Sequence, residues 1–272
     1  MAGPGRRIAL LLQYYGAALA GSQRQANAPT VQGALEDAVH SLTGAPTRCD
    51  FAGRTDAGVH ALGQVAALTT TATVPLHRWP RGLNHFLPAD IAIQAAREVP
   101  GDFDPRRHAV DRTYCYRVRL APQRQPIWER GAWVLSGPLD VEAMQSALNV
   151  LEGEHDFAAF AGRTDGAGTV RTLQESSLHA TVNGLEFRFR ASGFLPHQVR
   201  HTVGQVIAVG RGNASLSLIQ ELLTQPRTGA AGPAAPPQGL YLVRVRYDLA
   251  ALQGWAPCQR SEDDEDVCWS TG

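Results

Sequence analysis

A chain of 272 residues is long enough for one large domain or two of ordinary size. Hydrophobic residues make up 44% of it and charged residues 18%, which excludes a disordered protein, and no apolar run approaches the ~20 residues of a membrane helix. The apolar run at residues 8–12 is too short and too poorly flanked for a signal peptide. We therefore expect a cytoplasmic protein with no membrane contact.

The charge is unevenly distributed along the chain. All 25 basic residues are arginine, and five consecutive acidic residues occupy positions 262–266, so residues 1–260 hold 25 basic against 20 acidic groups, a net charge of +5. Guanidinium groups suit phosphate contacts and base stacking, although a coding bias also explains an all-arginine composition. The basic body fits a nucleic-acid partner. The acidic run is either a solvated end or a segment that competes with RNA.

The first half of the chain shows three predicted strands and two predicted helices. Period-two and apolar runs predict strands over residues 7–14, 64–70 and 91–96, with a polar, Gly-punctuated loop at 14–25. A helix is predicted over 31–43, with Thr30 as its cap and Gly44 at its end, and a short one over 79–86.

The second half repeats this mixture. Strands are predicted over 113–120, 185–190 and 241–247, and helices over 197–209 and 216–224. Another helix begins at the cap Asp140 and stops at Gly153, with a buried stripe of Val141, Met144, Leu148 and Leu151. Residues 228–238 are rich in Gly, Ala and Pro and predict a flexible surface loop.

Strands of antiparallel type, interspersed with helices roughly twice over, predict an α+β fold of two halves that meet in a cleft. We expect the first subdomain at residues 1–105, the second at 106–250, and a flexible acidic tail at 251–272.

One loop stands out as a candidate active site. Residues 51–61 read Phe-Ala-Gly-Arg-Thr-Asp-Ala-Gly-Val-His-Ala and place Asp56 two residues after Arg54 and between two glycines. Glycine allows a substrate to approach the main chain closely, and an arginine keeps a nearby carboxylate ionised. The alternative is an ordinary Gly-rich turn. Residues 160–168 repeat the Gly-Arg-Thr-Asp sequence around Asp165, but without the continuation Val-His-Ala-Leu-Gly-Gln-Val, and we interpret them as an exposed loop.

The metal-binding signals are weak. His197 and His201 are four residues apart on a predicted helix, but no Glu follows the first histidine and no acidic residue stands at ligand spacing. The four cysteines, at positions 49, 115, 258 and 268, form no Cys-x-x-Cys pair. We expect no metal, and a metallohydrolase built on the two histidines remains a rival hypothesis.

The loop at 53–61, followed by Gly63-Gln64-Val65, resembles the signature of the tRNA pseudouridine synthase A (TruA) family. Further blocks are similar to that family in order and spacing, from about residue 8 to 248: Tyr14-Tyr15-Gly16 with residues 21–25, residues 102–103, 112–117, 153–157, 170–173, 194–200 and 239–242.

The resemblance implies an isomerase that converts uridine to pseudouridine at positions 38–40 of the tRNA anticodon stem-loop. It implies the pseudouridine synthase fold, in which two similar subdomains with mainly antiparallel sheets join around a central basic cleft. It also implies a homodimer and no cofactor. By position, Asp56 is the nucleophile, Tyr114 stacks on the uracil and serves in proton transfer, and Arg200 pairs with Asp56. Arg54 fills the gap left by the extruded base. Further predicted substrate contacts are Thr55, His60, Gln64, Arg24, Arg106, Arg107 and Arg112.

The sequence also departs from the family pattern. Tyr15 stands where aspartate is usual, Leu19 where an aromatic residue is usual, and Ser22 where tryptophan is usual; Ser192 and Gln198 are further departures. These changes concern loop packing and tRNA docking, and hence which uridines are modified. A catalytically inactive tRNA-binding or chaperone protein of the same fold is the second hypothesis.

Overall fold

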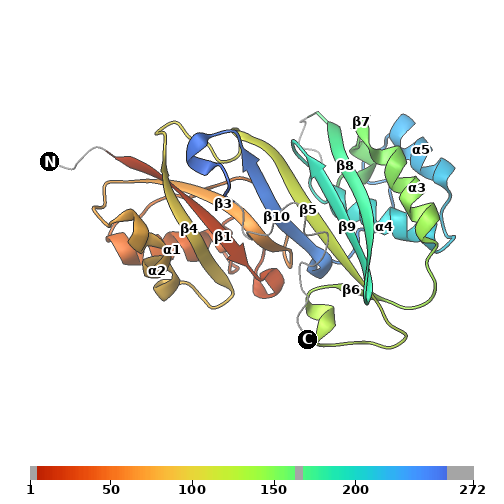
Figure 1. Cartoon of the computed structure of the whole chain (residues 1–272), viewed down its shortest axis with the longest axis horizontal. Coiled ribbons are helices and arrows are strands. Elements are labelled where there is room, and N and C mark those ends of the chain that lie inside the picture. The colour runs from red at the N-terminus through yellow and green to blue at the C-terminus, as the bar shows by residue number, and fades with distance from the viewer. Residues whose placement is uncertain (1–4, 163–167, 256–272) are drawn as a thin grey trace.

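The computed structural model describes residues 5–162 and 168–255. Its framework is one sheet of ten strands in the order β4-β1-β3-β10-β5-β9-β8-β7, with β2 paired to β3 and β6 to β5 (Figure 1). The first-half strands are β1 (Arg6–Tyr14), β2 (Asp50–Phe51), β3 (His60–Thr70) and β4 (Ile91–Val99). The others are β5 (Ala109–Leu120), β6 (Trp133–Leu135), β7 (Gly153–Asp156), β8 (Val170–Thr181), β9 (Gly184–Ala191) and β10 (Leu240–Tyr247).

The two halves of the sheet join where β3 and β10 run parallel. This junction has only two residue pairs, Tyr241 with His60 and Leu242 with Ala61, whereas β10 pairs antiparallel with β5 along most of its length. Apart from this pair and β5–β6, all neighbouring strands among the described residues are antiparallel. The predicted α+β class with mainly antiparallel pairing is confirmed. The subdomain division at residue 105 stays a prediction.

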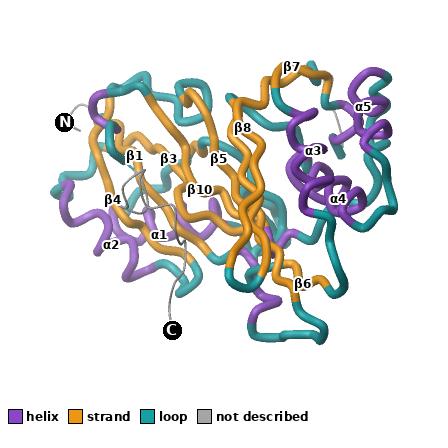
Figure 2. The backbone as a smooth tube through the Cα atoms, turned by 45° about the vertical axis from the view of Figure 1, so that its right-hand side comes forward, coloured by secondary structure: helices purple, strands orange, loops and turns teal. Residues whose placement is uncertain are grey.

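The helices form two groups at opposite ends of the sheet. Helices α1 (Val31–Thr43) and α2 (Trp79–Phe86) lie with β1, β3 and β4, while α3 (Val141–Leu151), α4 (Gln198–Gly210) and α5 (Leu216–Thr224) lie beside β7, β8 and β9 (Figure 2). Within the described part of the chain, every helix is too short or too polar to cross a bilayer.

Helix α1 follows from its end signals. The Thr30 side chain accepts a hydrogen bond from the backbone N–H of Gly33, and Gly44 takes a left-handed conformation, as expected for a cap and a stop. In α3 the cap Asp140 also forms, but Val141 is 42% exposed and the buried stripe is Met144, Ala147, Leu148 and Leu151. The prediction for Val141 is wrong because the first turn follows an exposed segment, residues 136–138, and burial begins one turn later.

Residues 228–238 were predicted to be a flexible surface loop, but they pack against the second half. Ala231 and Ala235 are fully buried, and the Ala235 N–H donates to the carbonyl of Arg200. A Cβ on Gly204 of α4 would lie 2.4 Å from the Pro233 carbonyl oxygen, so the helix and this segment are in close contact. Small residues allow this close approach, but they form no periodic apolar pattern, so the sequence alone did not indicate the packing.

The chain also remains packed beyond residue 250. A short 3-10 helix, Ala250–Leu252, follows β10, and Leu252 and Trp255 are buried. The predicted flexible tail therefore does not begin at residue 251. The acidic run at 262–266 and the loop around Asp165 lie outside the described residues.

Candidate active site

Asp56 lies in the loop between β2 and β3, on the border of the two halves of the sheet. Its carboxylate is 29% exposed and meets a guanidinium from α4, with Arg200 Nη1 lying 3.1 Å from Asp56 Oδ2. Arg200 is itself held in place, because its Nε donates to the Ala235 carbonyl at 2.8 Å. The ion pair joins residues 144 positions apart and leaves the carboxylate reachable from solvent.

The loop turns at a glycine that no other residue replaces easily. Gly58 has a φ of +80°, and a Cβ there would lie 2.9 Å from Cγ of Pro237. The N–H of Val59 donates to the carbonyl of Asp56 and closes the turn. The glycine thus brings the loop against residues 237–239 and points the backbone of Asp56 towards the second half.

Tyr14 and Ser22, near the N-terminus, bind the loop through hydrogen bonds to Thr55. The Thr55 N–H donates to Ser22 Oγ at 2.9 Å, the Ser22 N–H donates to the Thr55 carbonyl, and the Thr55 hydroxyl lies 2.8 Å from the Tyr14 hydroxyl. Burial raises the pKa of Tyr14 to about 12. Ser22, one of the departures from the family pattern, therefore serves as a buried acceptor for the candidate active-site loop.

Gln64 and Arg112 fix the start of the loop. Gln64 is fully buried, and its Nε2 donates to the Gly53 carbonyl at 3.0 Å. The Arg112 guanidinium donates to the carbonyl of Ala52 at 2.9 Å and to three further carbonyls, of which that of Ala109 is the most distant at 3.4 Å. Burial lowers the pKa of the guanidinium. These side chains already bind the protein's own carbonyls.

His60 is the centre of an aromatic stack at the junction of β3 and β10. Its ring lies between Tyr15 and Tyr241, with centroid distances of 4.5 and 4.7 Å. Nδ1 accepts from the Gly16 N–H at 3.0 Å, which leaves the proton on Nε2, 3.1 Å from the Gln238 carbonyl. Burial lowers the pKa of His60 to about 4, so the ring is neutral at pH 7.

Four predicted substrate contacts are therefore occupied inside the protein. His60, Gln64, Thr55 and Arg112 are at most 9% exposed, and each would have to leave its observed partners in order to touch RNA. In this structure Thr55, Gln64 and Arg112 hold the loop, and His60 holds the junction of β3 and β10. A direct contact of these four residues with substrate stays a prediction.

Tyr114 lies on β5 within the same region. It is 9% exposed, and its ring packs edge-to-face on Phe194 at 5.1 Å. Burial raises the pKa of its hydroxyl, and the nearby Tyr14 and Asp56 raise it further, so Tyr114 is a neutral phenol at pH 7. A neutral phenol next to a carboxylate keeps a proton that it can donate.

The predicted RNA-contacting arginines differ in their surroundings. Arg54 and Arg106 are exposed, and their guanidinium groups make no hydrogen bond or ion pair with any described residue. Arg107 is 87% exposed and lies 3.7 Å from Asp104, whereas Arg24 pairs with Glu36 at 2.7 Å. Arg54 and Arg106 are thus the two of this set that are fully available for a ligand.

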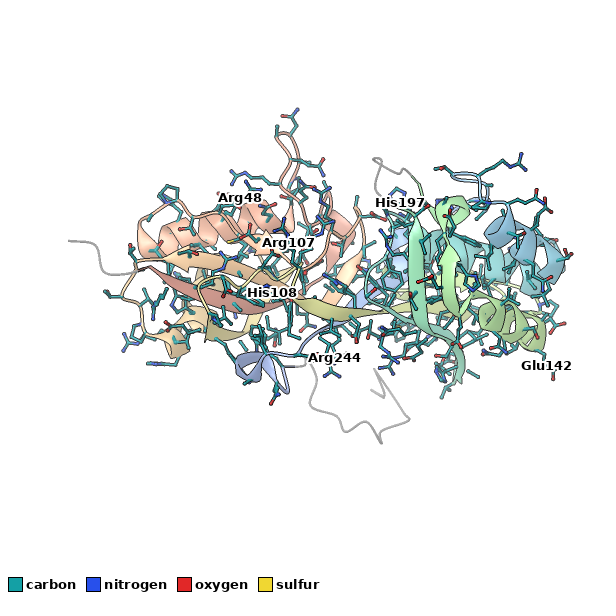
Figure 3. The ribbon with its side chains drawn as sticks, turned by 90° about the horizontal axis from the view of Figure 1, so that it is seen from above. Arg48, Arg107, His108, Glu142, His197 and Arg244 are labelled. Carbon is teal, nitrogen blue, oxygen red and sulfur yellow. The ribbon has the colours of Figure 1, made fainter. Side chains whose placement is uncertain are left out.

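His197 is a residue of the site that sequence reasoning considered only as a metal ligand. Its Nε2 lies 3.4 Å from Asp56 Oδ1, and Figure 3 shows it at the edge of the second half that faces the first. His201 instead places Nδ1 2.8 Å from the Gly232 carbonyl. Among residues 5–162 and 168–255, no three potential ligands come together as a metal site would require. His197 stands about one helical turn before Arg200 in the sequence, and this spacing could have indicated that both side chains lie near Asp56.

The comparisons with known proteins agree with one another. The family model described as tRNA pseudouridine synthase matches residues 12–106 and 147–248. Three curated relatives, from Burkholderia thailandensis, Geobacter sp. strain M21 and Myxococcus xanthus, are 42%, 43% and 40% identical. Each match covers 89% of this chain and 90%, 99% and 92% of the relative, respectively, and each relative is named tRNA pseudouridine synthase A.

Among solved structures, the archaeal box H/ACA sRNP Nop10–Cbf5 complex overlaps 72% of this chain and 44% of the matched chain. Its TM-score of 0.35 at 10% identity is too low to support an argument. The family match rests instead on the sequence, which it covers from β1 to β10 in two blocks. The chain belongs to the tRNA pseudouridine synthase family.

Proposed function

We propose that this protein isomerises uridine to pseudouridine in the anticodon stem-loop of tRNA, with Asp56 as the nucleophile. The observation that supports this most directly is the partly exposed Asp56 carboxylate, paired with Arg200 and held on a loop that is bound from beneath. The family membership supports the substrate class and the reaction.

The reaction exchanges one bond to the sugar for another. The N1–C1′ bond of the nucleotide breaks, the detached uracil turns, and C5 bonds to C1′; the C5 proton leaves to solvent and N1 takes up a proton, so the product is an isomer of the substrate. The oxidation level does not change, so no redox partner is needed. An ionised carboxylate next to the sugar and base promotes the first step, and Arg200 favours the ionised form of Asp56.

A base within a stem has to leave the stack before a side chain can reach it, which costs a few kcal/mol. Arg54 is exposed beside Asp56 in sequence, and its planar guanidinium suits the space that the extruded base leaves. Tyr114 would contact the flipped uracil and supply or accept a proton. Stacking on an aromatic ring contributes ~1–3 kcal/mol per base.

Phosphate contacts would position the tRNA. Of the arginines predicted for this role, we propose Arg54, Arg106 and Arg107, since their side chains are exposed, with Arg24 available once it leaves Glu36. We assign Arg112, which is buried, to the support of the loop. Such contacts fix the register of the RNA without reading its sequence.

We further propose that the enzyme acts as a homodimer. Ile127 and Trp128, in the segment between β5 and β6, are 81% and 55% exposed. Adjacent large apolar side chains in water favour burial against a partner, and a second copy is the simplest one. Light scattering measures the mass in solution directly.

The test is release of tritium from tRNA that contains [5-³H]uridine. We expect Asp56→Asn to lose turnover by several orders of magnitude while it binds tRNA as the wild type does. Asp165→Asn, in the look-alike loop, is the matched control and should retain turnover. Full activity of Asp56→Asn would refute the assignment, and a wild type that binds tRNA without releasing tritium would favour the inactive binding protein.

A further inference from the structure

His197 faces the one oxygen of Asp56 that Arg200 does not hold. Arg200 Nη1 lies 3.1 Å from Oδ2, and His197 Nε2 lies 3.4 Å from Oδ1. The two side chains come from the same end of α4, three residues apart, and approach the carboxylate from its two oxygens. A single contact at Oδ2 leaves the carboxylate free to rotate about its last torsion, whereas a second contact at Oδ1 fixes its plane.

The backbone of His197 is in a conformation that side chains usually avoid. Its φ of 64° and ψ of 0° lie in the left-handed region, and it is the only non-glycine residue with positive φ in the described part of the chain. Such a conformation is strained and persists where the surroundings fix it, often at functional sites. Here the conformation turns the imidazole away from the helix axis and towards Asp56.

The imidazole of His197 packs against Gly162 on the side away from Asp56. A Cβ on Gly162 would lie 2.4 Å from Nδ1 of His197, so only glycine at position 162 leaves room for the ring. The Gly162 N–H donates to the Pro196 carbonyl at 3.0 Å, which ties this segment to the residue before the histidine. The ring therefore stands between Gly162 and the Asp56 carboxylate. At 43% exposed it still faces solvent.

We propose that His197 is a positioning residue for Asp56. Its Nε2–H donates to Oδ1, and together with Arg200 it orients the carboxylate for reaction. Hydrogen bonds at active sites are often long without substrate and shorten in the complex, which fits the observed 3.4 Å. The inference rests on the proposed role of Asp56 as the nucleophile.

Two substitutions at position 197 test the side-chain contact with Asp56 separately from the left-handed backbone conformation. Asparagine tolerates the left-handed region, but its amide is too short to reach Oδ1, so His197→Asn keeps the backbone and removes the contact. Glutamine places a neutral N–H donor at nearly the same reach as Nε2, so His197→Gln restores the contact without an imidazole. His179→Asn, at an exposed histidine of β8, controls for loss of a histidine elsewhere.

The readout is the single-turnover rate of tritium release with enzyme in excess, together with the Kd for tRNA as a function of salt. We expect His197→Asn to slow the rate about 10- to 100-fold with Kd within about 2-fold, as for a misplaced reacting group. His197→Gln should remain within about 3-fold of the wild type, and His179→Asn should match it. Melting temperatures confirm that each variant is folded.

Three results would overturn the proposal. The first is a His197→Asn rate equal to that of the wild type. The second is an equal loss in the Asn and Gln variants, since a donor at Oδ1 would then be irrelevant. The third is a weaker Kd with a smaller salt dependence at an unchanged rate, which would make His197 a phosphate contact. Asp56→Asn, assayed alongside, separates these outcomes from failure of the proposed function, because only that failure leaves Asp56→Asn active.

Discussion

Replacement of Arg112 by methionine distinguishes a support of the loop from an RNA contact. The guanidinium is 9% exposed and donates to the carbonyls of Ala52 at 2.9 Å, Ser192 at 2.6 Å and Arg106 at 2.6 Å. These acceptors belong to the candidate active-site loop, to the segment after β9, and to the segment before β5. One side chain therefore joins the candidate active-site loop to both of these segments.

The size of the effect follows from these bonds. A hydrogen bond with a charged partner contributes about 1.5–3 kcal/mol, so these three, the shortest that Arg112 makes, give roughly 4.5–9 kcal/mol before the cost of burying the charge. Methionine has no charge, so the cost of burying the guanidinium disappears together with these bonds, and its side chain fills most of the space. We therefore expect Arg112→Met to lower the free energy of unfolding by about 3–5 kcal/mol, because each buried carbonyl that loses its donor costs ~1–3 kcal/mol.

Urea denaturation followed by circular dichroism measures this free energy, and filter binding over a range of salt measures the phosphate contacts. Arg112→Met should leave the salt dependence of tRNA binding unchanged under conditions where it is folded. Arg106→Met is the matched control: its side chain is exposed, so stability should change by less than about 0.5 kcal/mol while the salt slope falls by about 0.7–0.9. An Arg112→Met protein of wild-type stability would refute the reasoning.

Two further predictions concern the same region. The unfolded state protonates His60 near its ordinary pKa of 6.5, but the folded state does so only near 4, so stability is lost as the pH falls through this window. Between pH 7 and pH 5 the wild type should lose about 2 kcal/mol more than His60→Gln, as measured by urea midpoints; equal losses would contradict the assignment. Gly58→Ala should cost about 1–2 kcal/mol and slow turnover, because a Cβ there is strained at φ +80° and meets Pro237. Gly101→Ala, whose Cβ meets nothing within 4 Å, is its control, and equal effects of the two substitutions would count against the turn.

The sequence predicted those elements whose ends carry local signals. Helix α1 was predicted to the residue because Thr30 caps it and Gly44 ends it in a left-handed conformation. Strand β8 was not predicted from pattern, because only Leu173 and Ser176 of its twelve residues are buried and no alternation results. A strand covered on neither face by a regular apolar stripe has no periodic signal.

The candidate site was predictable only in part, for a related reason. The glycines and arginine around Asp56 mark the loop locally, but the pairing of Asp56 with Arg200 spans 144 residues and entered only through the family resemblance. The helix pattern around Arg200 does not identify a partner for it. The contact of His197 with Asp56 was missed because it depends on a left-handed residue at the start of α4, which no spacing rule predicts.

The contacts around the loop bear on how a flipped base meets Asp56. Thr55 is bound by Tyr14 and Ser22 through buried hydrogen bonds, and Gly53 is bound by Gln64 through a partly buried one. A carboxylate fixed in this way is oriented before the substrate arrives and needs no rearrangement at the moment of reaction. The movement that base extrusion requires then falls on the RNA and on exposed side chains such as Arg54. Substitutions beneath the loop should therefore impair the chemical step, and substitutions of the exposed arginines should impair binding.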